Sequence, residues 1–248
     1  MRERALEPRV SVVVPALNEA ANLPHVLGSL PPDVYEVILV DGGSTDDTVA
    51  VAKAAKPDIR VVHQDGHGKG NALRCGFDAA NGDIIIMVDA DGSTDGAEIP
   101  RFVDALKNGA DYAKGSRFID GGGSDDMTPV RRIGNSALGA AVNLLHRTRY
   151  SDLCYGYNAF WRTCLPRLRL DCDGFEIETL INIRVAKAGL NVVEVPSVEQ
   201  KRLYGESHLH VVRDGWRILR TIVRERFASG GDGPTVEAAP ALPQLSEP

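Results

Sequence analysis

The chain has 248 residues, of which 43% are hydrophobic and 25% are charged, and these values suit a globular protein with a substantial core. Its net charge of −6 argues against nucleic acid as the main partner, because such binding relies on basic side chains that neutralise phosphates. We expect a cytoplasmic protein, because the sequence shows no run of roughly eighteen apolar residues, no apolar signal-peptide core near its start and no paired metal spacing among its four cysteines.

The first half of the chain alternates short apolar runs with amphipathic stretches. The runs predict strands at 10–14, 34–40, 59–62, 84–88 and roughly 112–115, and the stretches predict helices near 19–30, 46–55, 69–80 and 96–107. Such alternation is typical of an α/β fold with a mainly parallel sheet and helices on its faces. Ligands of these sheets bind beyond the carboxyl ends of the strands, and the polar motifs of this chain begin there.

The second half is less regular. We expect a flexible loop at 121–126, a helix at 129–145, a strand at 158–162, a helix at about 175–188 and a short strand at 192–195. A last helix, at 209–227, repeats apolar residues on one side and arginines on the other. Residues 229–248 are rich in glycine, proline and alanine, which predicts a disordered tail.

Two carboxylates stand two residues apart in "VDADGS", directly after the predicted strand at 84–88. Side chains alternate along a strand, so Asp89 and Asp91 should point the same way as the chain leaves the sheet. Two like charges so close repel each other unless a cation or strong donors share them. The pair therefore predicts a site for a divalent metal that carries a phosphate.

The same motif has a second interpretation. Asp-x-Asp-Gly-Ser also occurs in phosphatases of the haloacid dehalogenase type, where Asp89 would be the nucleophile and Asp91 the acid or base. That motif usually follows the first strand of its sheet, whereas three predicted strands precede it here.

Two more motifs lie at the ends of predicted strands. In "PALNE", Pro15 ends a strand, and Asn18 or Glu19 can begin the next helix. In "VDGGSTDDT", Asp41 stands at the strand end, where it can hydrogen-bond a ribose or a base edge.

The stretch "GHGKGNALRCGF" is rich in glycine but is not a P-loop, because no Ser or Thr follows its lysine. Gly68 and Gly70 would let the backbone approach a ligand closely, and Lys69 could meet a phosphate at the helix start.

Five motifs in order, "PALNEAANL", "VDGGSTDDT", "GKGNALRCGF", "MVDADGS" and "GSRF", resemble the family-two glycosyltransferases, which are inverting enzymes of the GT-A fold. The resemblance covers about residues 8–120. It implies a nucleotide-sugar donor, a UDP- or GDP-hexose, and Mg²⁺ or Mn²⁺ on Asp89 and Asp91. Gly42 departs from the pattern, because many relatives carry a second aspartate there. The donor-binding positions implied are Pro15, Ala16, Asn18, Glu19, Asp41, Lys69, Asp89 and Ala90.

The second half is similar to the polyprenyl-phosphate glycosyltransferases, the group that includes dolichyl-phosphate mannosyltransferase. The similarity rests on "SDLCYGYNAFWR", "DGFEIETLINIRVAKAGLNVVEVP" and "RLYGESHL". Arg202, Gly205 and Ser207 match an Arg-x-x-Gly-x-Ser signature, with His208 where a lysine is common. In that group arginines bind the phosphates of donor and acceptor, and guanidinium geometry suits phosphate. The matching positions are Arg117, Arg131 and Arg202.

The resemblance implies a single GT-A domain over 8–228 that moves a hexose to a lipid phosphate. It divides this domain into a nucleotide-sugar half at 8–120, an acceptor half at 121–207 and a C-terminal helix at 208–228. A lipid phosphate is anionic and needs no strong base. A hydroxyl of a soluble acceptor or glycan requires a carboxylate base.

Three carboxylates are candidates for such a base. The first is Asp152, in the matching acceptor loop. The others are Glu176 and Glu178. We expect only one of these two glutamates to face the site, because they lie on different sides of a helix.

The C-terminal helix has three interpretations. It could lie peripherally on the inner face of an anionic membrane with Trp216 and Phe227 inserted, dock on the protein itself, or form a dimer. A non-catalytic protein that binds nucleotide sugars is a further alternative for the whole chain.

Overall fold

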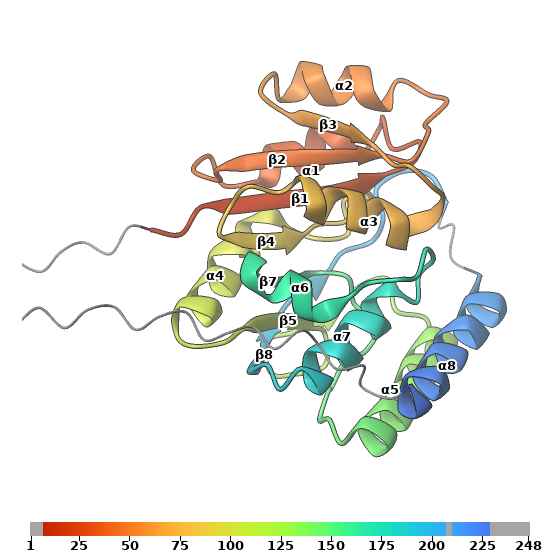
Figure 1. Cartoon of the computed structure of the whole chain (residues 1–248). Helices are drawn as coiled ribbons and strands as arrows, with labels where there is room; N and C mark the ends of the chain where they lie inside the picture. The colour runs from red at the N-terminus through yellow and green to blue at the C-terminus, as the bar shows by residue number, and fades with distance from the viewer. Residues whose placement is uncertain (1–6, 207–209, 229–248) are drawn as a thin grey trace, which may run out of the picture.

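A seven-stranded sheet, in the order β3-β2-β1-β4-β7-β5-β8, forms the centre of the computed structural model, which describes residues 7–206 and 210–228 (Figure 1). Strand β7 is antiparallel to its neighbours β4 and β5, and the other pairs are parallel. This arrangement confirms the predicted, mainly parallel α/β sheet. The strands are β1 (Val10–Ala16), β2 (Glu36–Asp41), β3 (Arg60–His63), β4 (Ile84–Met87), β5 (Tyr112–Ser116), β7 (Asn158–Trp161) and β8 (Val192–Pro196).

A short parallel pair of strands, β6 (Gly123–Ser124) and β9 (Val198–Glu199), forms a second sheet. The chain approaches β6 through Gly121, whose φ of +84° favours glycine. The predicted loop at 121–126 therefore contains a strand, and β9 was not predicted at all. Strands of this length leave no recognisable alternation of apolar and polar residues.

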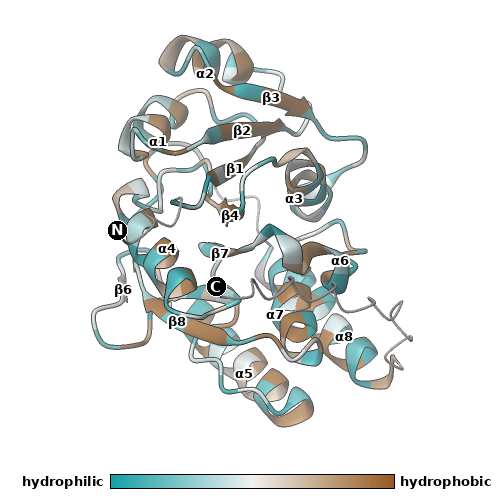
Figure 2. Ribbon diagram, turned by 60° about the vertical axis from the view of Figure 1, so that its left-hand side comes forward, coloured by the Kyte–Doolittle hydropathy of each residue, from teal (hydrophilic) through white to brown (hydrophobic). Residues whose placement is uncertain are grey.

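Helices cover both faces of the main sheet. One hydrophobic cluster joins β1, β2 and β4 to α1 (Leu23–Ser29), α2 (Thr48–Ala55) and α4 (Ile99–Lys107). The opposite cluster joins the sheet to α3 (Gly68–Ala79), α6 (Leu165–Leu168) and α7 (Ile177–Lys187). Figure 2 shows hydrophobic residues along strands such as β3 and β8, while the outer helices α2 and α8 carry both hydrophobic and hydrophilic residues. Two 3₁₀ turns, η1 (Gly96–Glu98) and η2 (Arg162–Cys164), precede α4 and α6.

Strand β4 positions the predicted metal motif. All four of its residues are buried, because helices cover both faces of the sheet, and this explains a continuous apolar run instead of an alternating one. The run ends just before Asp89, so the motif leaves the sheet at its carboxyl edge, as predicted.

The C-terminal helix α8 (Val211–Phe227) packs on α7 and on α5 (Pro129–His146), and Figure 1 shows α5 and α8 side by side, away from the main sheet. Its apolar stripe does not make this contact: Val212, Trp216 and Phe227 are 86%, 68% and 80% exposed. Ile218 is buried, and so is Ile222, which with Val223 was one of two alternatives for a position of the predicted stripe. Helix α8 therefore docks on the protein, which was one of the three interpretations, mainly through a face other than the stripe.

Charged partners explain why α8 adopts this orientation. Glu225 is buried on α8 and forms ion pairs with Arg184 (2.9 Å) and Lys187 (3.2 Å) of α7. Asp214, also buried, accepts a hydrogen bond from the backbone N–H of His210 (2.8 Å). In residues 7–206 and 210–228, no helix combines the length and apolar character needed to cross a membrane. Ser207, His208, Leu209 and the predicted tail at 229–248 lie outside the described residues.

Candidate active site

A cavity of about 300 Å³ opens at the carboxyl edge of the main sheet, and its volume lies in the range of small-molecule sites. Both halves of the chain contribute to its wall. The first half, residues 8–120, contributes Pro15, Ala16, Leu17, Glu19, Gly42, Gln64, Gly68, Lys69, Ala72, Asp89, Ala90, Asp91 and Ser93. The second half contributes Asp126, Arg131, Cys154, Tyr155, Gly156, Phe175, Glu178, Glu199 and Arg202.

The predicted aspartate pair lies in this wall, and both carboxylates are partly exposed, at 29% for Asp89 and 23% for Asp91. Asp91 is oriented by the backbone N–H of Ser93, which donates to its Oδ1 over 2.9 Å. Burial raises the pKa of Asp89 above its ordinary value, and Lys69 opposes this effect.

The chemistry of this pair fits Mg²⁺ or Mn²⁺, which prefer oxygen ligands and bind through one or two carboxylates plus substrate phosphates. Within the described parts of the chain, no group of three or more His, Cys, Asp or Glu side chains could hold a metal ion alone. Asp89 and Asp91 therefore suit an ion that completes its coordination with the substrate.

Lys69, in the first turn of α3, lies between two carboxylates. Its Nζ is 2.7 Å from Oδ1 of Asp89 and 2.6 Å from Oε1 of Glu178. Burial alone would lower the pKa of Lys69, but these two carboxylates outweigh burial and raise it. Glu178 thus faces the cavity, whereas Glu176 pairs with Arg217 of α8 over 3.1 Å, which confirms that only one of the two faces the site.

The glycines around Lys69 have a packing role that was not predicted. A Cβ atom at Gly68 or Gly70 would collide with backbone carbonyl oxygens of Asp173 and Cys172. These glycines therefore allow α3 to approach the segment before α7, and the backbone N–H of Gly70 donates to Asp173 O over 2.8 Å. Gly68 also lines the cavity, so the close approach of its backbone to a ligand stays a prediction.

Two of the predicted donor-binding residues, Asn18 and Asp41, do not line the cavity. Asn18 Oδ1 accepts a hydrogen bond from the backbone N–H of Thr45 over 2.8 Å. Asp41 accepts from the backbone N–H groups of Gly43 (3.3 Å) and Ser44 (3.2 Å). Both side chains hold the loop that follows β2. The other predicted donor-binding residues, Pro15, Ala16, Glu19, Lys69, Asp89 and Ala90, line it.

Arg117 and Asp152 form a buried ion pair beneath the cavity and do not line it. Arg117 Nε is 2.7 Å from Oδ2 of Asp152, and the two side chains are 2% and 0% exposed. Burial would raise the pKa of Asp152, but Arg117 outweighs burial and lowers it. The structure therefore contradicts the prediction that Asp152 faces an acceptor as a base, because its carboxylate is enclosed and already paired.

Arg117 also fails to reach the cavity, yet it supports the wall. Its Nη1 lies 3.0 Å from Oε2 of Glu199, and its guanidinium stacks 4.7 Å from the ring centre of Tyr155. Arg117 thus positions two residues that do line the cavity.

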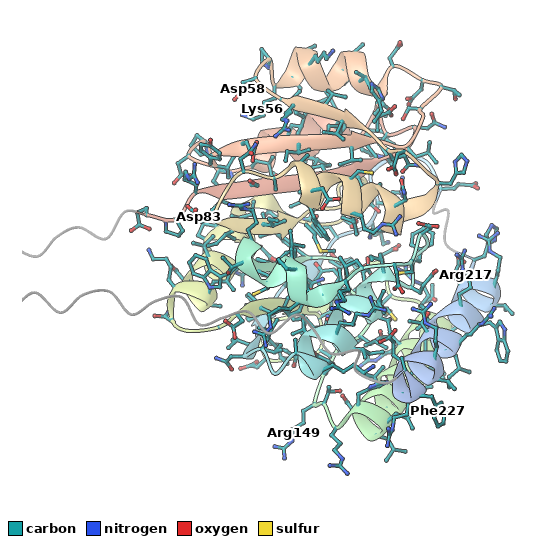
Figure 3. All side chains as sticks on the ribbon, viewed as in Figure 1. Lys56, Asp58, Asp83, Arg149, Arg217 and Phe227 are labelled. Carbon is teal, nitrogen blue, oxygen red and sulfur yellow. The ribbon has the colours of Figure 1, made fainter. Side chains whose placement is uncertain are left out.

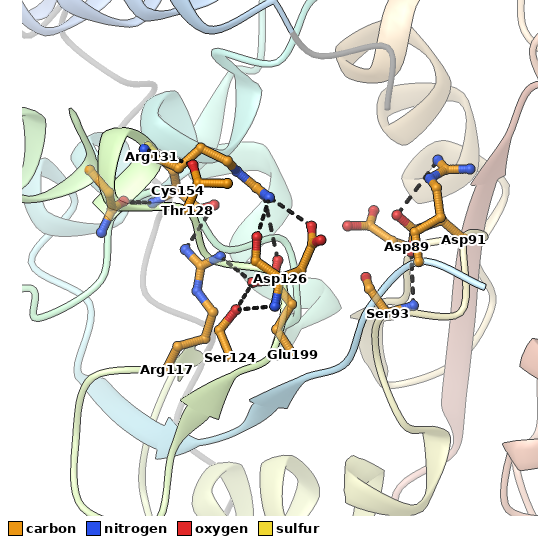
Figure 4. A network of polar contacts seen from close by, with 12 residues as sticks. Asp89, Asp91, Ser93, Arg117, Ser124, Asp126, Thr128, Arg131, Cys154 and Glu199 are labelled. Carbon is orange, nitrogen blue, oxygen red and sulfur yellow. Dashed lines mark hydrogen bonds and ion pairs between the residues drawn. The ribbon is translucent and has the colours of Figure 1, made fainter. Parts of the chain in front are cut away.

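Arg131 and Arg202 reach the cavity, as predicted. Arg131 Nη1 pairs with Asp126 over 2.7 Å, and its Nη2 lies 3.8 Å from Glu199 (Figure 4). Arg202 pairs with Glu19 over 2.8 Å and lies 3.6 Å from Asp91. Figure 4 shows the group around Arg131 on one side and Asp89 and Asp91 on the other.

Asp126, Tyr155 and Glu199 line the cavity but were not predicted as site residues. Glu199 comes from β9, and Asp126 comes from the coil after β6. The sequence has no periodic signal in either segment. The one clue to Asp126 is the acidic end of "GGGSDD", which was interpreted only as a loop.

Comparisons with known proteins agree with this geometry. A model of the glycosyl transferase family 2 matches residues 11–167. The chain is 33% identical over 218 residues to glycosyltransferase AglJ of Haloferax volcanii, covering 87% of this chain and 71% of AglJ. It is 32% identical over 215 residues to polyprenol monophosphomannose synthase of Mycolicibacterium smegmatis, covering 81% of each.

A solved structure is similar as well. Glucosyl-3-phosphoglycerate synthase of Mycobacterium tuberculosis, in complex with Mn²⁺, UDP and glucosyl-3-phosphoglycerate, matches with a TM-score of 0.70 and 26% identity over 88% of this chain and 80% of that one. The predicted GT-A fold is confirmed, and the dehalogenase-type phosphatase hypothesis for Asp89 was wrong. The chain belongs to glycosyltransferase family 2 and is a GT-A enzyme.

Proposed function

We propose that this glycosyltransferase moves a hexose, with inversion, from a UDP- or GDP-sugar to a polyprenyl phosphate in a metal-dependent reaction. The observation that carries the proposal is that Arg131 and Arg202 of the second half enter the same cavity as Asp89 and Asp91 of the first. One cavity thus offers a metal-phosphate site and two guanidinium groups suited to a second phosphate.

The charges of the cavity wall support metal dependence. The wall has six carboxylates and three cations, namely Glu19, Asp89, Asp91, Asp126, Glu178 and Glu199 against Lys69, Arg131 and Arg202. A nucleoside diphosphate carries further negative charge, and like charges repel strongly where water is partly excluded. Asp89 and Asp91 would hold a divalent ion, which when bound neutralises the charge that develops on the departing diphosphate.

The acceptor needs positive charge more than it needs a base. Arg131 and Arg202 would bind the lipid phosphate and reduce its repulsion from the donor. An anionic phosphate oxygen then attacks C1 of the hexose from the side opposite the diphosphate. The new C1–O bond forms as the bond to the diphosphate breaks, and no proton must be removed.

The names of relatives support this acceptor class. Polyprenol monophosphomannose synthase, by its name, acts on a polyprenol acceptor, and its match extends over 81% of this chain. We extend that acceptor class to this chain because Arg131 and Arg202 occupy the cavity.

Helix α8 provides a means of reaching a lipid. Its exposed stripe of Val212, Trp216 and Phe227 borders a row of arginines that includes Arg213 and Arg220, and Figure 3 places Arg217 and Phe227 toward opposite ends of the helix. Aromatic side chains beside basic ones favour the surface of an anionic membrane. We propose that α8 brings the cavity to the inner face of the membrane by peripheral contact.

A second candidate is transfer to a hydroxyl of a soluble acceptor. It is favoured by Glu178, a carboxylate in the cavity wall, and by the solved neighbour, which holds glucosyl-3-phosphoglycerate. A hydroxyl acceptor would use Glu178 as its base.

An assay of transfer separates the two candidates. Labelled UDP-glucose, UDP-galactose and GDP-mannose are offered with Mn²⁺ to a short polyprenyl phosphate or to 3-phosphoglycerate, with EDTA as the control. The proposal requires label in the organic extract, lost with EDTA. Label only in the aqueous phosphoglycerate product would establish the second candidate instead.

A further inference from the structure

Each of the three cations that line the cavity is paired with a carboxylate of the same wall. Lys69 pairs with Asp89 and Glu178, and Arg202 pairs with Glu19. The third pair joins Arg131 to Asp126, whose carboxylate Oδ2 lies 2.7 Å from Nη1. An acceptor phosphate that binds Arg131 must therefore compete with a carboxylate that is already there.

Asp126 differs from the other partners in its exposure to solvent. The side chains of Asp89, Glu178 and Glu19 are 29%, 9% and 7% exposed, so all three are more buried than Asp126. Asp126 lies in the coil between β6 and α5, downstream of the turn at Gly121, and its side chain is 43% exposed. A side chain on such a coil can turn toward solvent without moving a helix or strand.

The backbone of Arg131 is held at the start of a helix, whereas Asp126 lies in a coil. The N-cap residue Thr128 accepts a hydrogen bond from the backbone N–H of Arg131 over 3.3 Å, at the start of an 18-residue helix. Asp126 also receives a second contact from Nη1, to its backbone oxygen over 3.1 Å. The guanidinium can therefore stay in the cavity when the Asp126 carboxylate leaves.

We propose that the Asp126 carboxylate is a placeholder for the acceptor phosphate and thereby determines acceptor specificity. This inference rests on the proposed function, in which Arg131 binds that phosphate. A phosphate monoester carries up to two charges and can accept two parallel N–H groups, so it displaces the carboxylate. A neutral acceptor offers Arg131 no such gain and leaves the Arg131–Asp126 pair closed.

The test compares Asp126→Asn with Asp125→Asn, which removes the same charge one residue away. Asp125 is exposed and offers its backbone N–H to Glu199 O over 2.8 Å, a contact that the substitution keeps. Partly exposed ion pairs contribute up to about 1 kcal/mol, so Asp126→Asn should lower the KM for a short polyprenyl phosphate about two- to fivefold, with the donor KM unchanged. Asp125→Asn should leave the acceptor KM within error of the native value.

An acceptor KM that stays the same or rises in Asp126→Asn would overturn the inference, because Asp126 would then merely hold Arg131 in position. Equal melting temperatures of the variants exclude a loss of folding as the cause.

A measurement of acceptor binding that requires no transfer of hexose tests this inference separately from the proposed function. Citronellyl phosphate is titrated calorimetrically into the native protein, Asp126→Asn and Asp126→Asn with Arg131→Gln. Tighter binding by Asp126→Asn that disappears when Arg131 is also replaced supports the placeholder, even if no hexose reaches a lipid phosphate. Transfer to lipid phosphate without tighter binding refutes the placeholder alone.

Discussion

Arg202 donates two hydrogen bonds to Glu19, over 3.0 Å from Nη1 to Oε2 and 2.8 Å from Nη2 to Oε1, although 183 residues separate them in sequence. The pair ties the segment after β9 to the turn before α1, and so joins the two halves of the chain in the cavity wall. Asn22 reinforces the closure, because its side chain accepts from the backbone N–H of Tyr204 over 3.0 Å.

Replacing Arg202 with alanine should reduce use of the lipid phosphate more than donor binding. A charged hydrogen bond to phosphate is worth about 1.5–3 kcal/mol, so kcat/KM for the acceptor should fall about 10- to 100-fold. The donor Kd, measured by calorimetry with UDP or GDP and Mn²⁺, should change less than fivefold. Lys201→Ala, one residue away and exposed, is the matched control. Unchanged acceptor kinetics would remove Arg202 from the acceptor site.

The Asp91→Ala variant should lose metal-dependent nucleotide binding and keep its fold. A ligand that binds only the folded state raises the melting temperature by mass action, so the shift with Mn²⁺ and the preferred nucleotide should vanish. The measurement is a thermal-shift panel with UDP, GDP, CDP and dTDP, repeated with EDTA. Asp104→Ala, on the exposed side of α4, should retain the full shift. A metal-dependent shift that survives in Asp91→Ala would contradict the metal assignment.

Glu178→Gln distinguishes a base from a residue that orients Lys69. Loss of a general base typically costs about 10²- to 10⁴-fold in rate. With a phosphate acceptor no base is needed, and Lys69 keeps its 2.7 Å contact with Asp89, so kcat should fall less than about tenfold. The measurement is kcat with saturating donor and acceptor. A fall of a hundredfold or more would instead favour a hydroxyl acceptor.

Trp216→Ser should weaken binding to anionic vesicles about tenfold, because insertion of a large apolar side chain is worth about 1.5–3 kcal/mol. Trp216 is 68% exposed, so the melting temperature should hold, whereas Ile222→Ser in the buried face should lower it by several degrees. Cosedimentation with phosphatidylglycerol vesicles measures the binding. Added salt should reduce it further, because the arginines act through screened charges. Vesicle binding that is indifferent to both Trp216 and salt would argue for a protein partner on α8.

Local patterns in the sequence were sufficient to predict the main sheet and the position of the aspartate pair at its edge. A buried run such as Ile84–Met87 specifies a strand, and the side chains directly after it must lie at the carboxyl edge. The helical period of α8 likewise gave the residues that share a face. It could not tell which face is buried, because that depends on the ion pairs between Glu225 and α7.

Long-range pairs account for the remaining errors. Asp152 looked like a free carboxylate in an acceptor loop, but Arg117, 35 residues earlier, encloses it. Gly68 and Gly70 were interpreted only through a ligand, and the sequence did not reveal that they also accommodate the backbone of residues 172 and 173, about a hundred positions away. A single sequence contains no local signal for such contacts, since they follow from the packing of whole elements.

The surroundings of His146, near the end of α5, predict that the free energy of unfolding depends on pH. Its Nε2 lies 3.1 Å from the backbone oxygen of Ile222 on α8. Burial lowers the pKa of His146 below its ordinary value of 6.5; the contact with Ile222 and Glu225 oppose this shift, and Lys187 and Arg226 add to it. The unfolded chain therefore binds the proton first on acidification. Stability from this group is complete above about pH 6.5 and is lost as the pH falls from there through the folded pKa.

Urea unfolding between pH 5 and pH 7.5 tests this relation through the packing of α8 on α5. One proton limits the slope to about 1.4 kcal/mol per pH unit, and the partial exposure of His146 keeps the measured slope well below that limit. His146→Gln retains a side-chain amide that can donate to Ile222 O but does not titrate, so its stability should fall less than that of the native protein across this window. His25→Gln, exposed on α1, should follow the native curve. If the native protein and His146→Gln lose stability in parallel, the acid sensitivity belongs to other groups, and the contact between α5 and α8 is independent of this proton.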